Sequence, residues 1–195
     1  MKLPEIIIDS GFRVSMMRAF VAVEVHSKEV LDAIANLQTD FDIKASPVSK
    51  QNMHFTLLFL GEITNDDAEN VERLLSGIIF KPIELSFTHL GVFPNPKFPR
   101  VVWIGVDKDA SEHLVKLAAQ VEKNLAPLGF KPDKPFRPHL TIFRVKNMIG
   151  DISKKIEEHR QVNLGKDVIC ELKFKKSILT SNGPIYSDLQ VIKAQ

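Results

Sequence analysis

The chain has 195 residues, of which 44% are hydrophobic and 26% are charged, a composition typical of a soluble globular protein. Its 26 basic and 24 acidic residues leave a net charge of only +2, which argues against a long nucleic-acid groove or an anionic membrane partner. No apolar stretch approaches the roughly 20 residues that a membrane span needs, and the N-terminus lacks a signal-peptide core. We therefore expect a cytoplasmic protein without membrane contact, and any contact with nucleic acid should be small and local.

The first sixteen residues, "MKLPEIIIDSGFRVSM", differ in pattern from the rest of the chain. Strand-like alternation begins at "MRAFVAVEV", where Phe20, Ala22 and Glu24 share one face and the intervening valines share the other. We expect residues 1–16 to be a peripheral N-terminal extension. Residues 17–195 are then expected to form one domain.

Helical spacing of apolar residues predicts four helices along the chain. The first follows Ser27 as N-cap and extends to about Phe41, and the second begins near Thr64 or Asn65 with acidic residues in its first turn. A third is predicted from about Asp109 to Leu125, and a short fourth from Ile152 to His159. Inward-facing positions of the first three are Val30, Leu31, Ile34, Leu37, Phe41, Val71, Leu74, Leu75, Ile78, Leu114, Leu117, Ala118, Val121 and Leu125.

Strand candidates lie between and after these helices. They are "ELSFTHLGVF", "RVVWIGV", "DVICELKFKKSILTS", "IYSDLQVI" and two further segments, "MHFTLLFLG" and "PHLTIFRV". The single cysteine, Cys170, lies in one of these runs and is expected to be a buried small hydrophobic residue. Strands mixed with helices in this order predict an α+β protein with two similar halves and antiparallel sheets.

The segments "MHFTLLFLG" and "PHLTIFRV" both contain His-x-Thr followed by apolar residues. With six histidines and six threonines in the chain, two such matches by chance have a probability of roughly 1%. On a strand, residues two apart share a face, so His54 and Thr56 should point one way and Phe55, Leu57 and Phe59 the other. His139 and Thr141 should likewise share a face, and an internal duplication would bring the two pairs together across a cleft.

Two imidazoles across a cleft suit a reaction that removes a proton from one oxygen and delivers a proton to another. Histidine titrates near neutrality, so one copy can act as a base and the other as an acid. Threonine hydroxyls can donate hydrogen bonds to anionic oxygens, and a nearby arginine can neutralise growing charge. This set of groups fits phosphodiester hydrolysis without a metal or other cofactor.

Other chemistries have less support in the residues. A structural role for the histidines stays open, since histidine in a strand is often a satisfied structural residue. A two-histidine metal site lacks a third ligand at a recognisable spacing, because neither HExxH nor CxxC is present. Neither a Walker A loop, a GxGxxG loop nor a GxSxG elbow occurs.

With these motifs and flanks, residues Met17 to about Ile192 resemble the two-histidine (2H) phosphoesterase superfamily. The similarity is greatest to RNA 2′,3′-cyclic phosphodiesterases, formerly called 2′-5′ RNA ligases, and it extends over "MRAFVAVEV", "NMHFTLLFLGE", "GVFPNPKFPRVVWIGV", "FRPHLTIFRV" and "GPIYSDL". The resemblance implies a bilobal α+β fold, with pseudo-symmetric lobes around a central cleft that holds both His-x-Thr motifs.

The resemblance also implies the site residues. His54 and His139 correspond to the catalytic pair, Thr56 and Thr141 to the phosphate-binding threonines, and Arg144 to an arginine that commonly follows the second motif. Strict alternation from His139 would put Arg144 on the opposite face, unless a twist, a bulge or the end of the strand intervenes. Phe59 occupies the equivalent position in the first motif. Tyr186, Trp103 and Phe136 are weaker candidates for contact with a nucleotide.

The implied activity is metal-independent opening of a 2′,3′-cyclic phosphate at an RNA end to give a 2′-phosphate. Joining of RNA ends through a 2′-5′ bond in the same cleft is one alternative. A module that binds an RNA end or a nucleotide without catalysis is another, although a binder does not need two histidines. The expected partner is therefore RNA with a 2′,3′-cyclic phosphate terminus, bound by a monomer.

Overall fold

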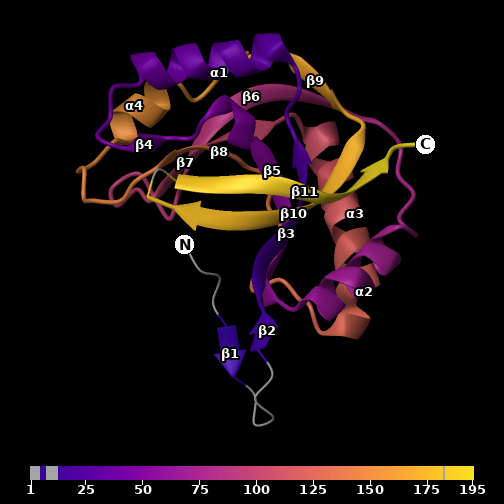
Figure 1. Cartoon of the computed structure of the whole chain (residues 1–195). Helices are drawn as coiled ribbons and strands as arrows, with labels where there is room; N and C mark the ends of the chain where they lie inside the picture. Colours follow the sequence, from indigo (N-terminus) through magenta and orange to yellow (C-terminus); the bar gives the residue numbers. More distant parts are fainter. Residues whose placement is uncertain (1–4, 8–12, 182) are drawn as a thin grey trace.

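The computed structural model describes residues 5–7, 13–181 and 183–195, which form helices and antiparallel strands (Figure 1). The α-helices are α1 (Lys28–Asp40), α2 (Asn65–Leu75), α3 (Lys108–Leu125) and α4 (Ser153–Glu158), with short 3-10 helices η1 (Lys50–Asn52) and η2 (Ala126–Leu128). The strands are β1 (Glu5–Ile7), β2 (Arg13–Ser15), β3 (Met17–Glu24), β4 (Ser46–Pro47), β5 (His54–Ile63), β6 (Ile83–Phe93), β7 (Val101–Val106), β8 (Leu140–Arg144), β9 (Lys166–Ile169), β10 (Glu171–Thr180) and β11 (Gly183–Lys193).

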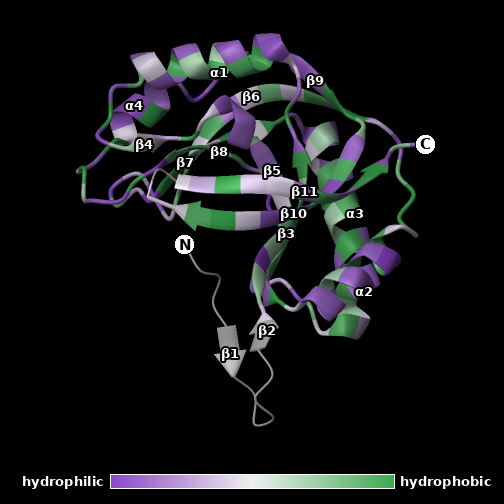
Figure 2. Ribbon diagram, in the orientation of Figure 1, coloured by the Kyte–Doolittle hydropathy of each residue, from purple (hydrophilic) through white to green (hydrophobic). Residues whose placement is uncertain are grey.

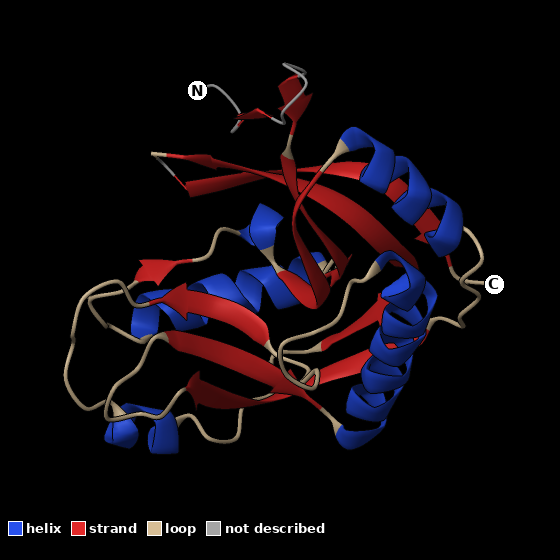
Figure 3. Ribbon diagram, turned by 90° about the horizontal axis from the view of Figure 1, so that it is seen from below, coloured by secondary structure: helices blue, strands red, loops and turns tan. Residues whose placement is uncertain are grey.

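Two antiparallel sheets carry the fold, as the sequence predicts. The first has the strand order β11-β10-β3-β5, and the second has the order β4-β8-β7-β6-β9. Seen from below in Figure 3, the strands form two separate groups, and helices α2 and α3 lie together on one side. The first His-x-Thr motif is on β5 and the second leads into β8, so each sheet contributes one motif.

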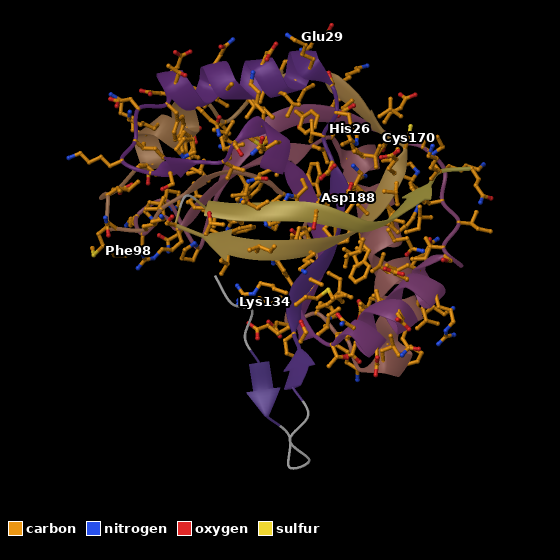
Figure 4. All side chains as sticks on the ribbon, in the orientation of Figure 1. His26, Glu29, Phe98, Lys134, Cys170 and Asp188 are labelled. Carbon is orange, nitrogen blue, oxygen red and sulfur yellow. The ribbon has the colours of Figure 1, made fainter. Side chains whose placement is uncertain are left out.

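The chain passes between the sheets at Cys170, which corrects two expectations. The run "DVICELKFKKSILTS" is two strands, because β9 pairs with β6 in the second sheet whereas β10 pairs with β3 and β11 in the first. Cys170 is the one residue between them, at the position labelled in Figure 4. Its side chain is exposed, so the prediction that it is buried is wrong. The residues around Cys170 have the composition of a continuous strand, so the sequence did not indicate that the chain crosses from one sheet to the other there.

Helix boundaries follow local capping groups. The Ser27 hydroxyl accepts a hydrogen bond from the Val30 amide, and Thr64 and Asp67 form a reciprocal capping box at the start of α2. Asp107 caps α3 in the same way through the Ala110 amide. Hydrophobic and hydrophilic residues alternate along α1 and α2 in Figure 2, as expected for helices that bury one face. All four predicted helices are therefore present, and they begin within one or two residues of their expected starts. Helix α2 ends at Leu75, so Ile78, which the spacing placed on its inward face, lies outside the helix.

One continuous hydrophobic core extends through both sheets and the helices. Phe55 from β5 stacks on Phe87 from β6, with ring centroids 6.3 Å apart, so side chains from the two sheets pack directly against each other. Such a shared core fixes the position of one sheet relative to the other. It thereby holds the two motifs in a defined geometry.

The N-terminal strands stand apart from this core. β1 and β2 form a two-stranded sheet of their own, which projects beyond β3 in Figure 1. Strand β3 begins at Met17, where the first sheet starts. Within the described ranges, no helix has the length and apolar character needed to cross a membrane.

Candidate active site

His54 is the first residue of β5, where the sequence turns from η1 into the strand. Its Nδ1 lies 2.8 Å from the carbonyl oxygen of Asn52, two residues earlier. The imidazole packs between Phe20 and Tyr186, with ring centroids 5.1 and 5.2 Å away. These contacts orient the ring and leave Nε2 without a hydrogen-bond partner among the residues that the structure describes.

His139 repeats this arrangement just before β8. Its Nδ1 lies 2.7 Å from the carbonyl oxygen of Arg137, again two residues earlier. Phe93 packs edge-on against the ring at a centroid distance of 5.1 Å, and Trp103 lies 6.4 Å away. When Nδ1–H donates to a carbonyl, Nε2 of the neutral ring is an acceptor, and Nε2–H of the charged ring is a donor. Both histidines thus present the same ring nitrogen for proton transfer.

A β-bulge in β8 decides where Arg144 points. Val102 pairs with Phe143, and the next residue of β7, Trp103, pairs with Thr141, so Ile142 has no partner. Ile142 and Phe143 are both buried, whereas Thr141 is half-buried and Arg144 is exposed. The extra residue resets the alternation of faces. Arg144 therefore lies on the same face of the strand as Thr141, in spite of its odd distance from His139.

The first motif has a bulge at the equivalent position. Val21 pairs with Leu58 and Ala22 pairs with Thr56, which leaves Leu57 as the extra residue. Leu57 and Leu58 are both buried, and Phe59 is 71% exposed. The prediction that Phe59 shares the apolar face with Phe55 and Leu57 is therefore wrong, because the bulge returns it to the face of Thr56. The matching bulges support the inferred internal duplication.

One cavity of about 830 Å³ brings residues of both motifs together. Thr56 from the first sheet and His139 from the second line it, together with Phe59 and Phe93. His54, Thr141 and Arg144 are not among the residues that line this cavity. One residue of each motif, Thr56 and His139, therefore borders this open space.

Burial is the main influence on the pKa of both histidines, and the charge of Arg144 acts in the same direction. The pKa of His54 is lowered to about 4, and burial is the largest cause. The charges of Lys175 and Arg144 act in the same direction, and the Asn52 carbonyl and the Glu24 carboxylate oppose the shift. Burial also lowers the pKa of His139, and Arg144 acts in the same direction. The charge of Arg144 likewise opposes the rise that burial causes in the pKa of Tyr186. Arg144 is thus electrostatically coupled to residues of both sheets.

A buried network of charged residues lies beside His54 and was not predicted from the sequence. Lys173 and Lys175 on β10 are 8% and 4% exposed, and both form ion pairs with Glu24 and Asp188. Burial raises the pKa of Glu24, but hydrogen bonds from the two lysines outweigh it and hold the pKa below its usual value. Glu24 is the cross-strand neighbour of His54. Lys173 and Lys175 alternate with the apolar residues Leu172 and Phe174 along one strand, and this pattern was the sequence signal that could have indicated the network.

The three weaker candidates for contact with a nucleotide, Tyr186, Phe136 and Trp103, have different surroundings. Tyr186 is half-buried against Phe20 and His54, and Phe136 lines the cavity. Trp103 is half-buried, and its ring lies over Gly91, where a Cβ atom would come within 2.1 Å of the indole. Gly91 therefore makes room for the indole, which forms part of the wall behind His139. No group of three or more His, Cys, Asp or Glu residues within the described ranges is placed to hold a metal ion.

Comparison with known proteins places the chain in a family. A family model described as LigT-like phosphoesterase matches twice, over residues 23–103 and 104–186. The chain belongs to the LigT-like phosphoesterase family. Each match contains one His-x-Thr motif, in agreement with the paired sheets and bulges.

Relatives of similar length carry one name. A protein from Archaeoglobus fulgidus named RNA 2′,3′-cyclic phosphodiesterase is 39% identical over 180 residues, which cover 91% of this chain and all of the relative. A protein of the same name from Methanocaldococcus jannaschii is 35% identical and covers 91% of this chain and 99% of the relative.

Two solved structures have a similar fold. Escherichia coli LigT complexed with 3′-AMP has a TM-score of 0.74 at 22% identity, covering 92% of this chain and 99% of LigT. A protein of Thermus thermophilus has a TM-score of 0.72 at 26% identity, covering 91% of this chain and 97% of that protein. The bilobal α+β fold of this LigT-like phosphoesterase is therefore confirmed.

Proposed function

We propose that this chain hydrolyses 2′,3′-cyclic phosphate ends of RNA to 2′-phosphate ends, without a metal, by paired-histidine acid and base catalysis. The observation that carries the proposal is the repeated geometry of His54 and His139, each held through Nδ1 by the carbonyl oxygen two residues earlier, which leaves Nε2 for proton transfer. The names of the Archaeoglobus and Methanocaldococcus relatives support the choice of substrate.

In this mechanism water attacks phosphorus opposite the 3′ oxygen. The neutral Nε2 of His139 accepts a proton from the water as the new P–O bond forms, and Nε2–H of His54 donates a proton to the 3′ oxygen as its bond to phosphorus breaks. The hydroxyls of Thr56 and Thr141 donate hydrogen bonds to the non-bridging oxygens, and Arg144 neutralises their growing charge. The phosphate remains on the 2′ oxygen.

The assignment of base and acid follows from the family resemblance rather than from the pKa values. The charge of Arg144 does not distinguish the two roles, since it lowers the pKa of both histidines. With its pKa near 4, His54 is neutral at pH 7 in the free protein and must gain a proton to act as the acid. An anionic cyclic phosphate bound beside it favours the imidazolium form.

Product analysis tests this proposal. An RNA oligonucleotide ending in a 2′,3′-cyclic phosphate is incubated with the protein at a tenfold excess of RNA, and the terminal phosphate is identified. We expect multiple turnovers and a 2′-phosphate product. A 3′-phosphate product would contradict the direction of opening, and stoichiometric binding without turnover would support the non-catalytic alternative. Addition of an RNA with a 5′-hydroxyl end tests ligation, which would appear as a longer product joined through a 2′-5′ bond.

A further inference from the structure

The cavity beside His139 is larger than one phosphate requires. Its volume of about 830 Å³ is near the upper end of the roughly 300–1000 Å³ that is common for small-molecule sites. Beyond Thr56 and His139, much of its lining comes from the segment 131–137, which leads directly to His139. The space therefore extends from the reacting groups along one defined stretch of chain.

Positive charge is concentrated in this cavity. Four cationic side chains line it, against the single carboxylate of Asp133, although the whole chain has a net charge of only +2. The four are Arg100, Lys131, Lys134 and Arg137. Lys131, Lys134 and Arg137 are exposed and form no ion pair within the described part of the chain. Lys134 is labelled in Figure 4, below strand β10. Cations without an ion-pair partner at a cavity wall attract an anionic group.

Aromatic surface faces the same space. Phe59 lines the cavity and is 71% exposed, an unusual exposure for phenylalanine, and the half-buried Phe136 lines it from the segment 131–137. Cations that follow a sugar-phosphate backbone and aromatic rings on which bases stack are the two features of a site for single-stranded nucleic acid. Neither feature is needed to bind an isolated phosphate.

The segment 131–137 is also stiff and connected to the reaction. Pro132 and Pro135 line the cavity, and Pro138 follows, so three φ angles are fixed before any ligand binds. The carbonyl oxygen of Arg137 accepts the hydrogen bond that orients His139. A ligand held by this segment is therefore placed in a fixed relation to the imidazole.

We propose that this cavity binds the nucleotide on the 5′ side of the reacting end of a single-stranded RNA, with its backbone phosphate at Lys131, Lys134 and Arg137 and its base against Phe59. The inference rests on the proposed function and specifies its substrate class, an oligonucleotide in preference to a cyclic mononucleotide. A duplex end does not fit, because its paired bases are not free to stack on Phe59.

The test compares two substrates with two pairs of substitutions. The substrates are a 2′,3′-cyclic mononucleotide and a single-stranded trinucleotide with the same cyclic end. The test variant is K131Q/K134Q, and the matched control is K116Q/K123Q on the exposed face of α3, which removes the same charge. We expect the test variant to lower kcat/KM for the trinucleotide about tenfold, mainly through KM, because phosphate contacts contribute to binding. It should change kcat/KM for the mononucleotide less than twofold, and the control should change neither.

Phe59→Ala gives an independent readout of base stacking. It should raise KM for the trinucleotide about tenfold while leaving the salt dependence of binding unchanged, because stacking involves no released counterion. Equal effects of K131Q/K134Q on both substrates, or the same loss in the control variant, would overturn the subsite.

A binding measurement separates this inference from the proposed function. If the wild-type protein opens neither substrate, the proposed function fails. Fluorescence anisotropy with a labelled trinucleotide ending in 3′-phosphate then still reads the subsite. Binding that is tighter than that of a nucleoside 3′-phosphate, and weakened by K131Q/K134Q but not by K116Q/K123Q, supports the subsite. Equal affinity for the two probes contradicts it.

Discussion

The burial of His54 makes the stability of the protein depend on pH. Burial lowers the pKa of this imidazole from 6.5 to about 4, so between these values the unfolded chain binds a proton that the folded protein excludes. Stability gained from the neutral ring is fully present above pH 6.5 and is lost as the pH falls toward 4. Integration over the shift gives a loss of about 2 kcal/mol in the free energy of unfolding between pH 8 and pH 5.

Urea unfolding of the wild type and of His54→Gln at pH 8 and pH 5 measures this loss. The substitution removes the titrating ring. The change in the free energy of unfolding between pH 8 and pH 5 should therefore be smaller by about 2 kcal/mol in the variant than in the wild type. His113→Gln, at an exposed histidine on α3, is the matched control and should behave like the wild type. Because pH 5 is above the usual pKa values of carboxyl groups, Glu24 and Asp188 contribute little. An equal loss in the wild type and His54→Gln would refute the argument that burial keeps this ring neutral.

Three further predictions concern metal, the N-terminus and salt. Turnover should survive excess EDTA, since imidazoles and hydroxyls carry out the proposed reaction; loss with EDTA and recovery with a divalent ion would contradict it. Removal of residues 1–16 should leave turnover within a few-fold of the wild type and the thermal midpoint nearly unchanged. The reason is that β1 pairs with β2 and belongs to neither of the two large sheets. A lower thermal midpoint would show that this segment supports the fold. The slope of log affinity against log salt concentration for a cyclic-phosphate oligonucleotide should lie between about −0.7 and −2, as expected for one to three phosphate contacts on a single strand. A steeper slope that grows with RNA length would indicate a more extended RNA-binding surface.

The sequence was sufficient for the helices and for the motifs. Helical spacing and capping residues such as Ser27 and Thr64 located the helices, because these signals depend on neighbours within a few residues. The repeated His-x-Thr pattern indicated two related halves, since residues two apart on a strand share a face whatever the rest of the fold does. Local patterns of this kind need no knowledge of which strands pair.

Features that depend on strand pairing were not accessible from the sequence. The bulges at Leu57 and Ile142 are visible only in the register with the neighbouring strands, and they moved Phe59 and Arg144 to the face of the threonines. The crossover at Cys170 has the composition of a strand, and only the two different partners of β9 and β10 reveal it. The ion pairs of Glu24 join β3 to β10, residues about 150 positions apart in the chain.

The central claim, that His54 and His139 act as acid and base, is tested most directly by a substrate whose 3′ leaving oxygen is replaced by sulfur. A thiolate departs with little protonation, so the acid becomes dispensable while the base does not. On the normal substrate we expect His54→Ala and His139→Ala each to lower turnover by roughly 100-fold or more. On the sulfur substrate His54→Ala should be substantially rescued and His139→Ala should not. The opposite pattern would reverse the two roles, and wild-type activity of both variants on the normal substrate would contradict the account.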